Sequence, residues 1–270
     1  MCDPMRLKIN HKTRYDYGMP IPYGLQQLRL TPQSSAIQSI VDWTVTLEGA
    51  KREAQFTDQH GNLVDLVSVE PNANAISITS IGEVETTDGA GIMGPHDSAT
   101  PLWYFKRDTD FTRPGPRLTA LIASFKSDGL ADLDRLHALS QHIGAAVAYD
   151  TGSTHATTTA ENAVKSGRGV CQDHTQVFLG AARSLGYPAR YVSGYLMMDD
   201  RDQQDASHAW AEAFVEDLGW VGFDVSNGIS PDERYVQLAT GLDYTEAAPI
   251  SGFVVGGGTE SMIVTLQVQQ

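Results

Sequence analysis

The 270-residue chain is long enough for one large domain or two ordinary ones with a sizeable core. Its formal net charge of −14 argues against a nucleic-acid or anionic-membrane partner, because binding phosphate groups requires basic patches. Two cysteines are too few for a disulfide framework, no apolar run approaches the length of a membrane span, and residues 1–6 lack a signal-peptide pattern. We therefore expect a cytoplasmic protein.

The first hundred residues have the apolar–polar alternation of strands with one buried face. The alternation is clear at residues 7–9, 28–30, 41–45 and 76–78, and turn-forming residues separate these segments. Several short strands with regular turns predict an antiparallel sandwich or barrel-like domain. Arg113-Pro114-Gly115-Pro116-Arg117 is typical of a linker, so we place the boundary there and expect domains at residues 1–112 and 113–270.

After the linker the apolar residues recur at helical spacing. Residues 118–125 and 130–147 each predict a helix with one apolar face, and a shorter helix is expected at 160–164 after a threonine N-cap. Three strand-like segments follow at 190–197, 206–216 and 219–225, and a closing strand is expected at 262–268. Helices and antiparallel strands in this order predict an α+β protein.

Cys171 follows a short glycine-containing loop and opens a further helical segment. The apolar positions of that segment are Val177, Phe178, Ala181, Ala182 and Leu185. Gly186 and Pro188 supply the signals that end a helix. A thiol in the first turn of a helix lies near free backbone N–H groups and the positive end of the helix dipole, which favour the nucleophilic thiolate. The alternative is a small buried apolar residue, which free cysteines often are.

Two further residues can serve such a nucleophile. His208 lies 37 residues after Cys171, and Asp224 lies 16 residues after His208. A cysteine nucleophile needs a base, and the base needs an orienting group, so the ordered set Cys171, His208 and Asp224 can supply all three roles. Direct opposition of His208 and Asp224 in a hairpin requires its centre at residue 216. We therefore predict a bulge or an asymmetric loop that brings the pair together.

Four motifs resemble those of a known family. They are Gly169-Val170-Cys171-Gln172-Asp173, Gly186-Tyr187-Pro188-Ala189-Arg190-Tyr191-Val192-Ser193-Gly194-Tyr195, Ser207-His208-Ala209-Trp210-Ala211-Glu212 and Gly219-Trp220-Val221-Gly222-Phe223-Asp224. In this order they are similar to the motifs of bacterial transglutaminase-like cysteine peptidases. Residues 11–17 and 28–32 also resemble the β-rich N-terminal domain that accompanies these cores. Two positions depart from the family pattern: Asp224-Val225-Ser226-Asn227 stands where many members have Asp-Pro-Thr-Asn, and Leu242 replaces a common arginine.

The resemblance implies an N-terminal antiparallel β-rich domain at 1–112. It implies a papain-like transglutaminase core at 113–270, with the nucleophile helix packed on an antiparallel sheet. By motif position Cys171 is the nucleophile, His208 the base and Asp224 the orienting residue of a catalytic triad. We therefore expect a hydrolase of the thiol protease type that cleaves peptide or amide bonds of a peptide or protein substrate by acyl transfer through a thioester. The backbone N–H of Cys171 is one expected oxyanion donor.

We expect no cofactor and no metal. Three alternatives stay open: amine transfer as in a protein-glutamine gamma-glutamyltransferase, an inactive peptide-binding module, and a zinc ion held by Cys171, His174 and His208. Zinc is the weakest of these because a structural site needs four ligands and no second ligand pair is present. We also expect the N-terminal domain to shape the cleft or to restrict access to Cys171.

Overall fold

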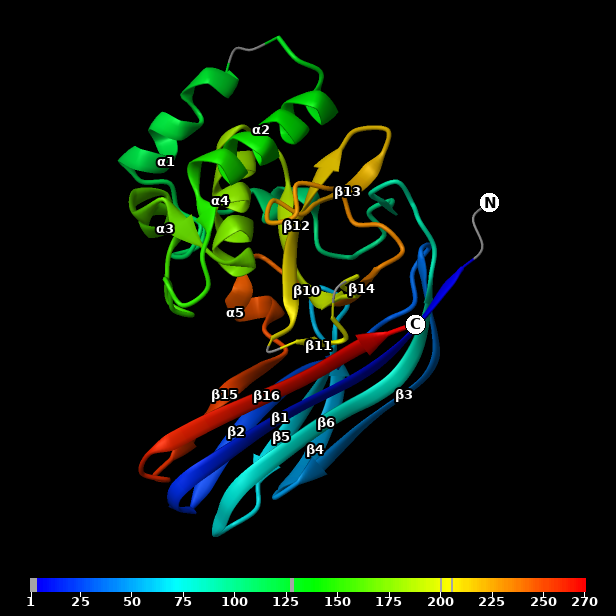
Figure 1. Ribbon diagram of the computed structural model, residues 1–270, viewed down its shortest axis with the longest axis vertical. Coiled ribbons are helices and arrows are strands. Elements are labelled where there is room, and N and C mark those ends of the chain that lie inside the picture. The colour runs from blue at the N-terminus through cyan, green and yellow to red at the C-terminus, as the bar shows by residue number, and fades with distance from the viewer. Residues whose placement is uncertain (1–3, 127–128, 200, 205) are drawn as a thin grey trace.

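The computed structural model describes residues 4–126, 129–199, 201–204 and 206–270. Figure 1 shows a lower part built of long strands and an upper part in which helices and a second sheet pack together. All sheets but one two-stranded pair are antiparallel. The predicted α+β class, with a β-rich N-terminal region followed by helices and a second antiparallel sheet, is confirmed.

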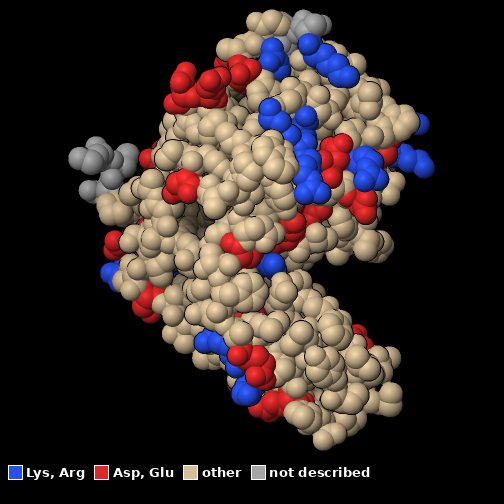
Figure 2. Space-filling view, turned by 180° about the vertical axis from the view of Figure 1, so that it is seen from behind, with Lys and Arg blue, Asp and Glu red and all other residues tan. Residues whose placement is uncertain are grey.

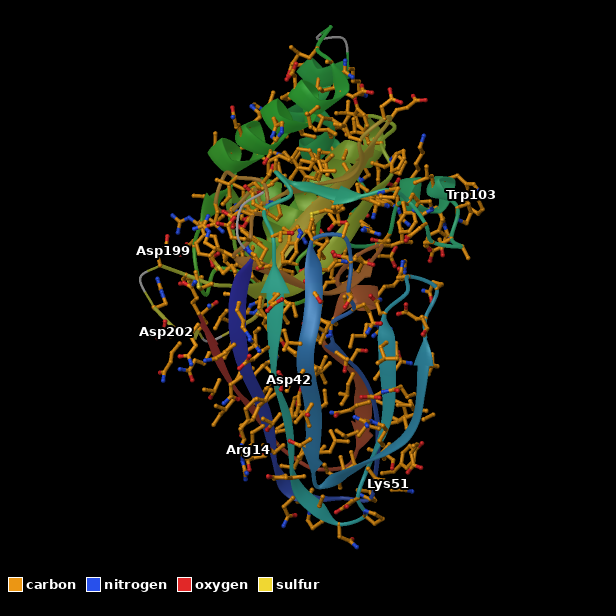
Figure 3. All side chains as sticks on the ribbon, turned by 90° about the vertical axis from the view of Figure 1, so that its right-hand side faces the viewer. Arg14, Asp42, Lys51, Trp103, Asp199 and Asp202 are labelled. Atoms are coloured by element: carbon orange, nitrogen blue, oxygen red, sulfur yellow. The ribbon has the colours of Figure 1, made fainter. Side chains whose placement is uncertain are left out.

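The lower part consists of two sheets that pack face to face, as a sandwich does. Its N-terminal strands are β1 (Met5–Ile21), β2 (Tyr23–Thr31), β3 (Gln38–Glu48), β4 (Ala50–Thr57), β5 (Leu63–Val69) and β6 (Ala73–Thr86). Alternate residues of β1 are buried, which is the period-two pattern expected of a half-buried strand. Figure 3 shows Arg14, Asp42 and Lys51 on the outer surface of these sheets.

The last two strands of the chain return to these sheets. β15 (Ile250–Val255) pairs with β2, and β16 (Glu260–Gln269) pairs with β1, giving the strand orders β15-β2-β5-β4 and β11-β16-β1-β6-β3. Conversely, β7 (Ile92–Gly94) pairs with a strand of the upper sheet. Strand pairing therefore does not follow the division at residues 112 and 113. Residues 250–269 were assigned to the core, but their backbone hydrogen bonds join them to strands of the N-terminal segment.

The upper part holds the nucleophile helix. Its helices are α1 (Pro116–Leu121), α2 (Asp132–Ala146), α3 (Ala160–Ser166), α4 (Cys171–Ser184) and α5 (Tyr244–Ala247), with the 3-10 helices η1 (Leu102–Lys106) and η2 (Ala123–Lys126). Thr159 caps α3 as predicted, because its side chain accepts a hydrogen bond from the Asn162 N–H. Val177, Phe178, Ala181 and Ala182 are fully buried, so the apolar face expected for α4 forms the centre of this core.

The sheet against which α4 packs has the order β14-β10-β12-β13-β7. Its longer strands are β10 (Ala189–Leu196), β12 (His208–Val215), β13 (Gly219–Phe223) and β14 (Tyr235–Gly241). The remaining strands are short: β8 (Ala148–Tyr149), β9 (Arg168–Gly169) and β11 (Gln203–Gln204). The predicted strands at 190–197, 206–216 and 219–225 are confirmed as β10, β12 and β13.

The two parts share a buried joint. Tyr195, Val236 and Leu238 of the upper sheet belong to the same apolar cluster as the interior of the lower sheets. Two polar side chains also cross the joint: the Gln38 amide donates to the Gln237 carbonyl, and the Asn62 amide exchanges hydrogen bonds with the backbone of Thr240. The described part of the chain contains no helix long and apolar enough to cross a membrane.

Candidate active site

Cys171 is the first residue of α4 and is partly buried. The loop before it is held by Asp173, whose carboxylate accepts hydrogen bonds from the Val170 N–H at 2.8 Å and from the Thr154 hydroxyl at 2.6 Å. A Cβ atom at Gly169 would lie 2.7 Å from the Cβ of Asp173, so only glycine fits this close approach. The thiol is therefore presented from a fixed turn at the N-terminal end of a buried helix. The other cysteine, Cys2, lies outside the described residues.

His208 and Asp224 lie side by side at one end of two neighbouring strands of the upper sheet. His208 begins β12, and its Nε2 atom lies 2.6 Å from Oδ2 of Asp224, with both side chains buried. Burial opposes the charged form of His208. The hydrogen bond to Asp224 and the interaction with Cys171 outweigh burial and raise the histidine's pKa. Burial likewise acts to raise the pKa of Asp224, but the hydrogen bond and charge of His208 dominate and lower it. The raised pKa of His208 and the lowered pKa of Asp224 both favour an imidazolium–carboxylate pair.

Four further donors hold the Asp224 carboxylate. Oδ2 accepts from the Asn227 amide at 2.7 Å and from the Tyr235 hydroxyl at 2.8 Å. Oδ1 accepts from the backbone N–H groups of Ser226 at 3.0 Å and Asn227 at 3.2 Å. Hydrogen bonds to the ionised form of a buried carboxylate offset the cost of removing it from water. Asp224 is therefore fixed in position and orients the imidazole of His208.

His208 and Asp224 are in contact as predicted, but the ladder between their strands has no bulge. β12 and β13 pair regularly from Val215↔Gly219 to Ala211↔Phe223, with three residues in the loop between them. If this register continues past β13, Asp224 lies opposite Trp210. Trp210 is two residues after His208 on the same strand. Residues offset by two lie on the same face of a sheet and within reach of a long side chain, so the pair meets diagonally.

Cys171 and His208 line one cavity of about 380 Å³. Its wall includes Tyr191, Ser193 and Tyr244 from the core and Gln203 and Gln204 of β11. Because Nε2 of His208 faces Asp224, the remaining ring nitrogen, Nδ1, is the one available to Cys171. The structure thus brings all three predicted site residues together: the thiol, the imidazole and the carboxylate are arranged in sequence from the cavity inward.

A second, larger cavity of about 750 Å³ continues from the first on the side of His208. His208, Tyr149, Thr151, Met198 and Arg201 line both. The segment that follows β10 forms one wall, and Figure 3 shows its residues Asp199 and Asp202 projecting at the surface. The two cavities together form an elongated cleft beside the thiol.

Comparisons with known proteins match both parts of the chain. Residues 119–225 match the model of the transglutaminase-like superfamily, and residues 7–85 match that of the bacterial transglutaminase-like N-terminal region. The chain therefore has a transglutaminase-like core preceded by a bacterial transglutaminase-like N-terminal region.

Relatives of this transglutaminase-like chain are found in mycobacteria. It is 26% identical to an uncharacterized protein of Mycobacterium leprae, with 97% of this chain and 98% of that protein covered. It is also 26% identical to an uncharacterized protein of Mycobacterium tuberculosis, with coverages of 96% and 90%. Among solved structures, a protein of Cytophaga hutchinsonii described as a "putative cysteine protease" superposes with a TM-score of 0.80. The identity is 21%, and 99% of this chain and 91% of that one are covered. This likeness establishes a shared fold.

Tyr235 is a site residue of this transglutaminase-like protein that sequence reasoning missed. It begins β14, which pairs with β10 and not with β12 or β13. No local pattern marks a tyrosine whose partner is reached only through that non-local pairing. Asn227 was noticed as part of a motif, and its contact with Asp224 gives that motif a physical role.

His174 was considered as a zinc ligand, but its ring is directed elsewhere. Nδ1 lies 2.8 Å from the Ser226 hydroxyl and Nε2 lies 2.8 Å from the Val147 carbonyl. Burial lowers its pKa, which favours the neutral ring. His174 therefore ties α4 to the loop that contains Asp224. Within the described residues no group of three or more His, Cys, Asp or Glu side chains is arranged to hold a metal ion.

Proposed function

We infer that this protein is a cysteine-dependent acyl-transfer enzyme that hydrolyses peptide or amide bonds. The observation that carries the proposal is the buried 2.6 Å contact between His208 and Asp224 beside the cavity into which the first residue of α4, Cys171, opens. In the proposed mechanism Cys171 is the nucleophile, His208 the general base and acid, and Asp224 the orienting residue.

In the first half of the reaction His208 holds the proton of Cys171, and the thiolate attacks the carbonyl carbon of the substrate. The new C–S bond moves an electron pair onto the carbonyl oxygen, where the backbone N–H of Cys171 is one donor. The C–N bond then breaks, His208 gives its proton to the departing amine, and a thioester remains on Cys171.

In the second half, His208 removes a proton from water, which attacks the thioester carbonyl. The C–S bond breaks, the carboxylic acid leaves, and the thiolate–imidazolium pair is restored. An amine in place of water would give a transglutaminase, which shares the first half of the reaction. An inactive peptide-binding module would bind the same cleft without forming the thioester.

The first experiment measures the rate of alkylation by iodoacetamide across pH. Fast alkylation of the wild type at low pH is expected to disappear in Cys171→Ser and to slow in His208→Ala. His155→Ala is the matched control because His155 is exposed and lines neither cavity of the cleft. A slow reaction with an ordinary thiol profile in the wild type would favour the binding module.

The second experiment separates hydrolysis from transfer. Peptide hydrolysis and the incorporation of a fluorescent primary amine into a glutamine-containing peptide are measured on the same preparation. We expect hydrolysis to dominate and both activities to be absent from Cys171→Ala. Undiminished hydrolysis by Cys171→Ala would refute the mechanism, and dominant amine incorporation would replace hydrolysis with transfer.

A further inference from the structure

A third cavity lies where the open side of the two lower sheets meets α5. Its volume is about 400 Å³. Its lining comes from β1, β2, β15, the start of β16 and α5, and from loop residues that include Phe111 and Ala156. Figure 2, which views the molecule from behind, shows an indentation between the upper and lower parts on this side of the protein. The cavity is thus bounded mainly by the N-terminal sheets and the strand β15 that returns to them.

The cavity adjoins the catalytic cleft at Tyr244. This residue lines both the Cys171 cavity and the third cavity. It begins α5, whose N-terminus is capped by the Asp243 side chain, and its ring lies 6.0 Å from that of Tyr191 in the catalytic wall. A chain that extends from the thiol toward Tyr244 therefore comes close to the third cavity.

The lining has one carboxylate and no basic side chain. Glu260, at the start of β16, makes no ion pair among the described residues and lies close to the hydroxyls of Tyr15 and Tyr17. Burial is the main cause of the raised pKa of Tyr15, about 12, and the negative charge of Glu260 adds to it. The two tyrosines share one face of β1, about 7 Å apart along the strand. Aromatic rings and a carboxylate together form the surroundings that an ammonium or guanidinium group prefers.

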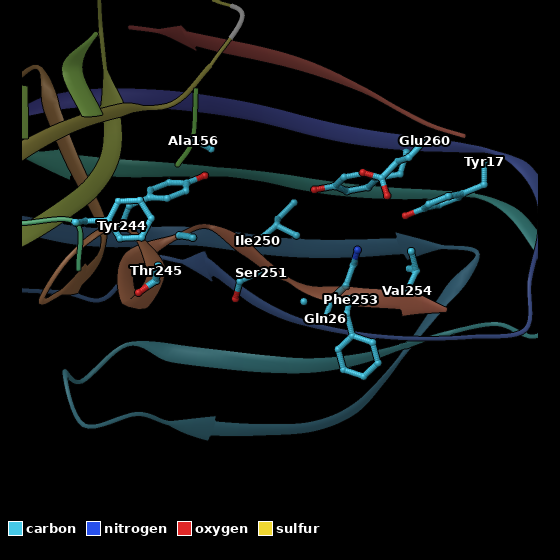
Figure 4. A pocket seen from close by; sticks show the side chains of 14 residues that line it. Tyr17, Gln26, Ala156, Tyr244, Thr245, Ile250, Ser251, Phe253, Val254 and Glu260 are labelled. Carbon is cyan, nitrogen blue, oxygen red and sulfur yellow. The ribbon is translucent and has the colours of Figure 1, made fainter. Parts of the chain in front are cut away.

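Gln26 adds a neutral polar group to the lining. Its side chain is 6% exposed, and Figure 4 shows its amide nitrogen directed toward the side where Tyr17 and Glu260 lie. Glu260 therefore supplies the only formal charge of the lining, and together with the aromatic rings it favours a positively charged ligand.

We propose that this cavity is a substrate subsite for a basic side chain, lysine- or arginine-like, of the peptide whose reacting carbonyl lies at Cys171. The aliphatic stem of such a side chain lies against Val254, and its charged end reaches Glu260 and the tyrosine hydroxyls. The subsite rests on the proposed function for its connection to the thiol, but its preference for a cation does not depend on turnover.

The test measures binding to Cys171→Ala protein, which cannot form a thioester. The probes are fluorescein-labelled octapeptides of alanine with one glutamine and one lysine, at spacings of about two to six residues, and a matched set with norleucine in place of lysine. At one spacing or a narrow range of spacings we expect the lysine peptide to bind roughly tenfold more tightly than its norleucine partner. Glu260→Gln is expected to abolish the difference.

Glu48→Gln is the matched control, because it removes the same charge from an exposed position of β3 outside this cavity. It should keep the lysine preference. Equal binding of the two peptide sets, no binding of any lysine peptide, or loss of preference in Glu48→Gln as well as Glu260→Gln would overturn the subsite. A lysine preference in binding with no thioester chemistry in the wild type would refute the proposed function and leave the subsite standing. Turnover by the wild type without any lysine preference in binding would refute the subsite and leave the proposed function standing.

Discussion

His11 makes the stability of the joint between the two parts dependent on pH. It lies on β1 and is 5% exposed, with Nδ1 3.0 Å from the Tyr195 hydroxyl of the upper sheet and Nε2 3.2 Å from the Thr13 hydroxyl. Both partners are neutral hydroxyls, so no negative charge in this contact stabilises a protonated ring. Burial therefore lowers the pKa of His11 from 6.5 to about 4.

The sign of the effect follows from proton binding. Between about pH 6.5 and 4 the unfolded chain holds a proton on His11 that the folded protein does not, so folding is weakened as pH falls through this window. The whole shift corresponds to about 3 kcal/mol, at about 1.4 kcal/mol for each pH unit. Between about pH 7 and 5.5 the loss amounts to about 1 kcal/mol. Above this pH window His11 is neutral in both the folded and the unfolded protein, so its contribution to the free energy of unfolding no longer changes with pH.

The assay is urea unfolding of wild type and His11→Gln at about pH 7 and 5.5, both above the sequence pI of about 4.8. Glutamine keeps hydrogen-bonding groups at the site but does not titrate. We expect the free energy of unfolding of the wild type to fall by about 1 kcal/mol more than that of His11→Gln over this interval. His155→Ala, at an exposed position, should behave as the wild type does. Equal losses in the wild type and His11→Gln would refute the reasoning.

Three other substitutions test the geometry of the site and its sheet. Asp224→Asn should lower kcat/KM for the best peptide substrate by about three to four orders of magnitude and leave KM little changed, because the histidine loses its charged partner. A loss of kcat/KM under tenfold would contradict an orienting role. Tyr235→Phe removes one hydrogen bond to the same carboxylate, so steady-state kinetics should show a loss of roughly tenfold in kcat, and a change confined to KM would argue against positioning. Gly194→Ala would place a Cβ 2.2 Å from the Val236 carbonyl oxygen and 2.5 Å from the Trp210 ring, so urea unfolding should show a cost of about 1–3 kcal/mol, and unchanged stability would exclude this close approach.

Local patterns in the sequence were sufficient to predict the elements that hold the thiol. The apolar spacing of α4 and the alternation in β12 depend only on residues close in the chain, and both were predicted. The grouping of Cys171, His208 and Asp224 was also predicted, because two of the three residues share one hairpin.

Features that depend on pairing between distant segments were not predicted. A bulge or an asymmetric loop was predicted to bring His208 and Asp224 together, yet side chains that reach across a diagonal of a regular ladder are enough. Tyr235 was missed because β14 reaches the site through β10. The pairing of residues 250–269 with N-terminal strands was not predicted for the same reason, since a strand's alternation shows that one face is buried but not which sheet it joins.

The return of β15 and β16 to the N-terminal sheets also constrains the order of folding. Lys8 pairs with Gln269, so this edge of β1 has no partner in β16 until residues 260–269 have been synthesised. Contacts between residues so far apart in sequence form slowly, and an open strand edge invites pairing with other chains in the meantime. Glu260 and Phe253 belong to β16 and β15, so the third cavity is completed only after these strands have been synthesised. A nascent chain that already has a folded Cys171 core would still lack its preference for basic substrates.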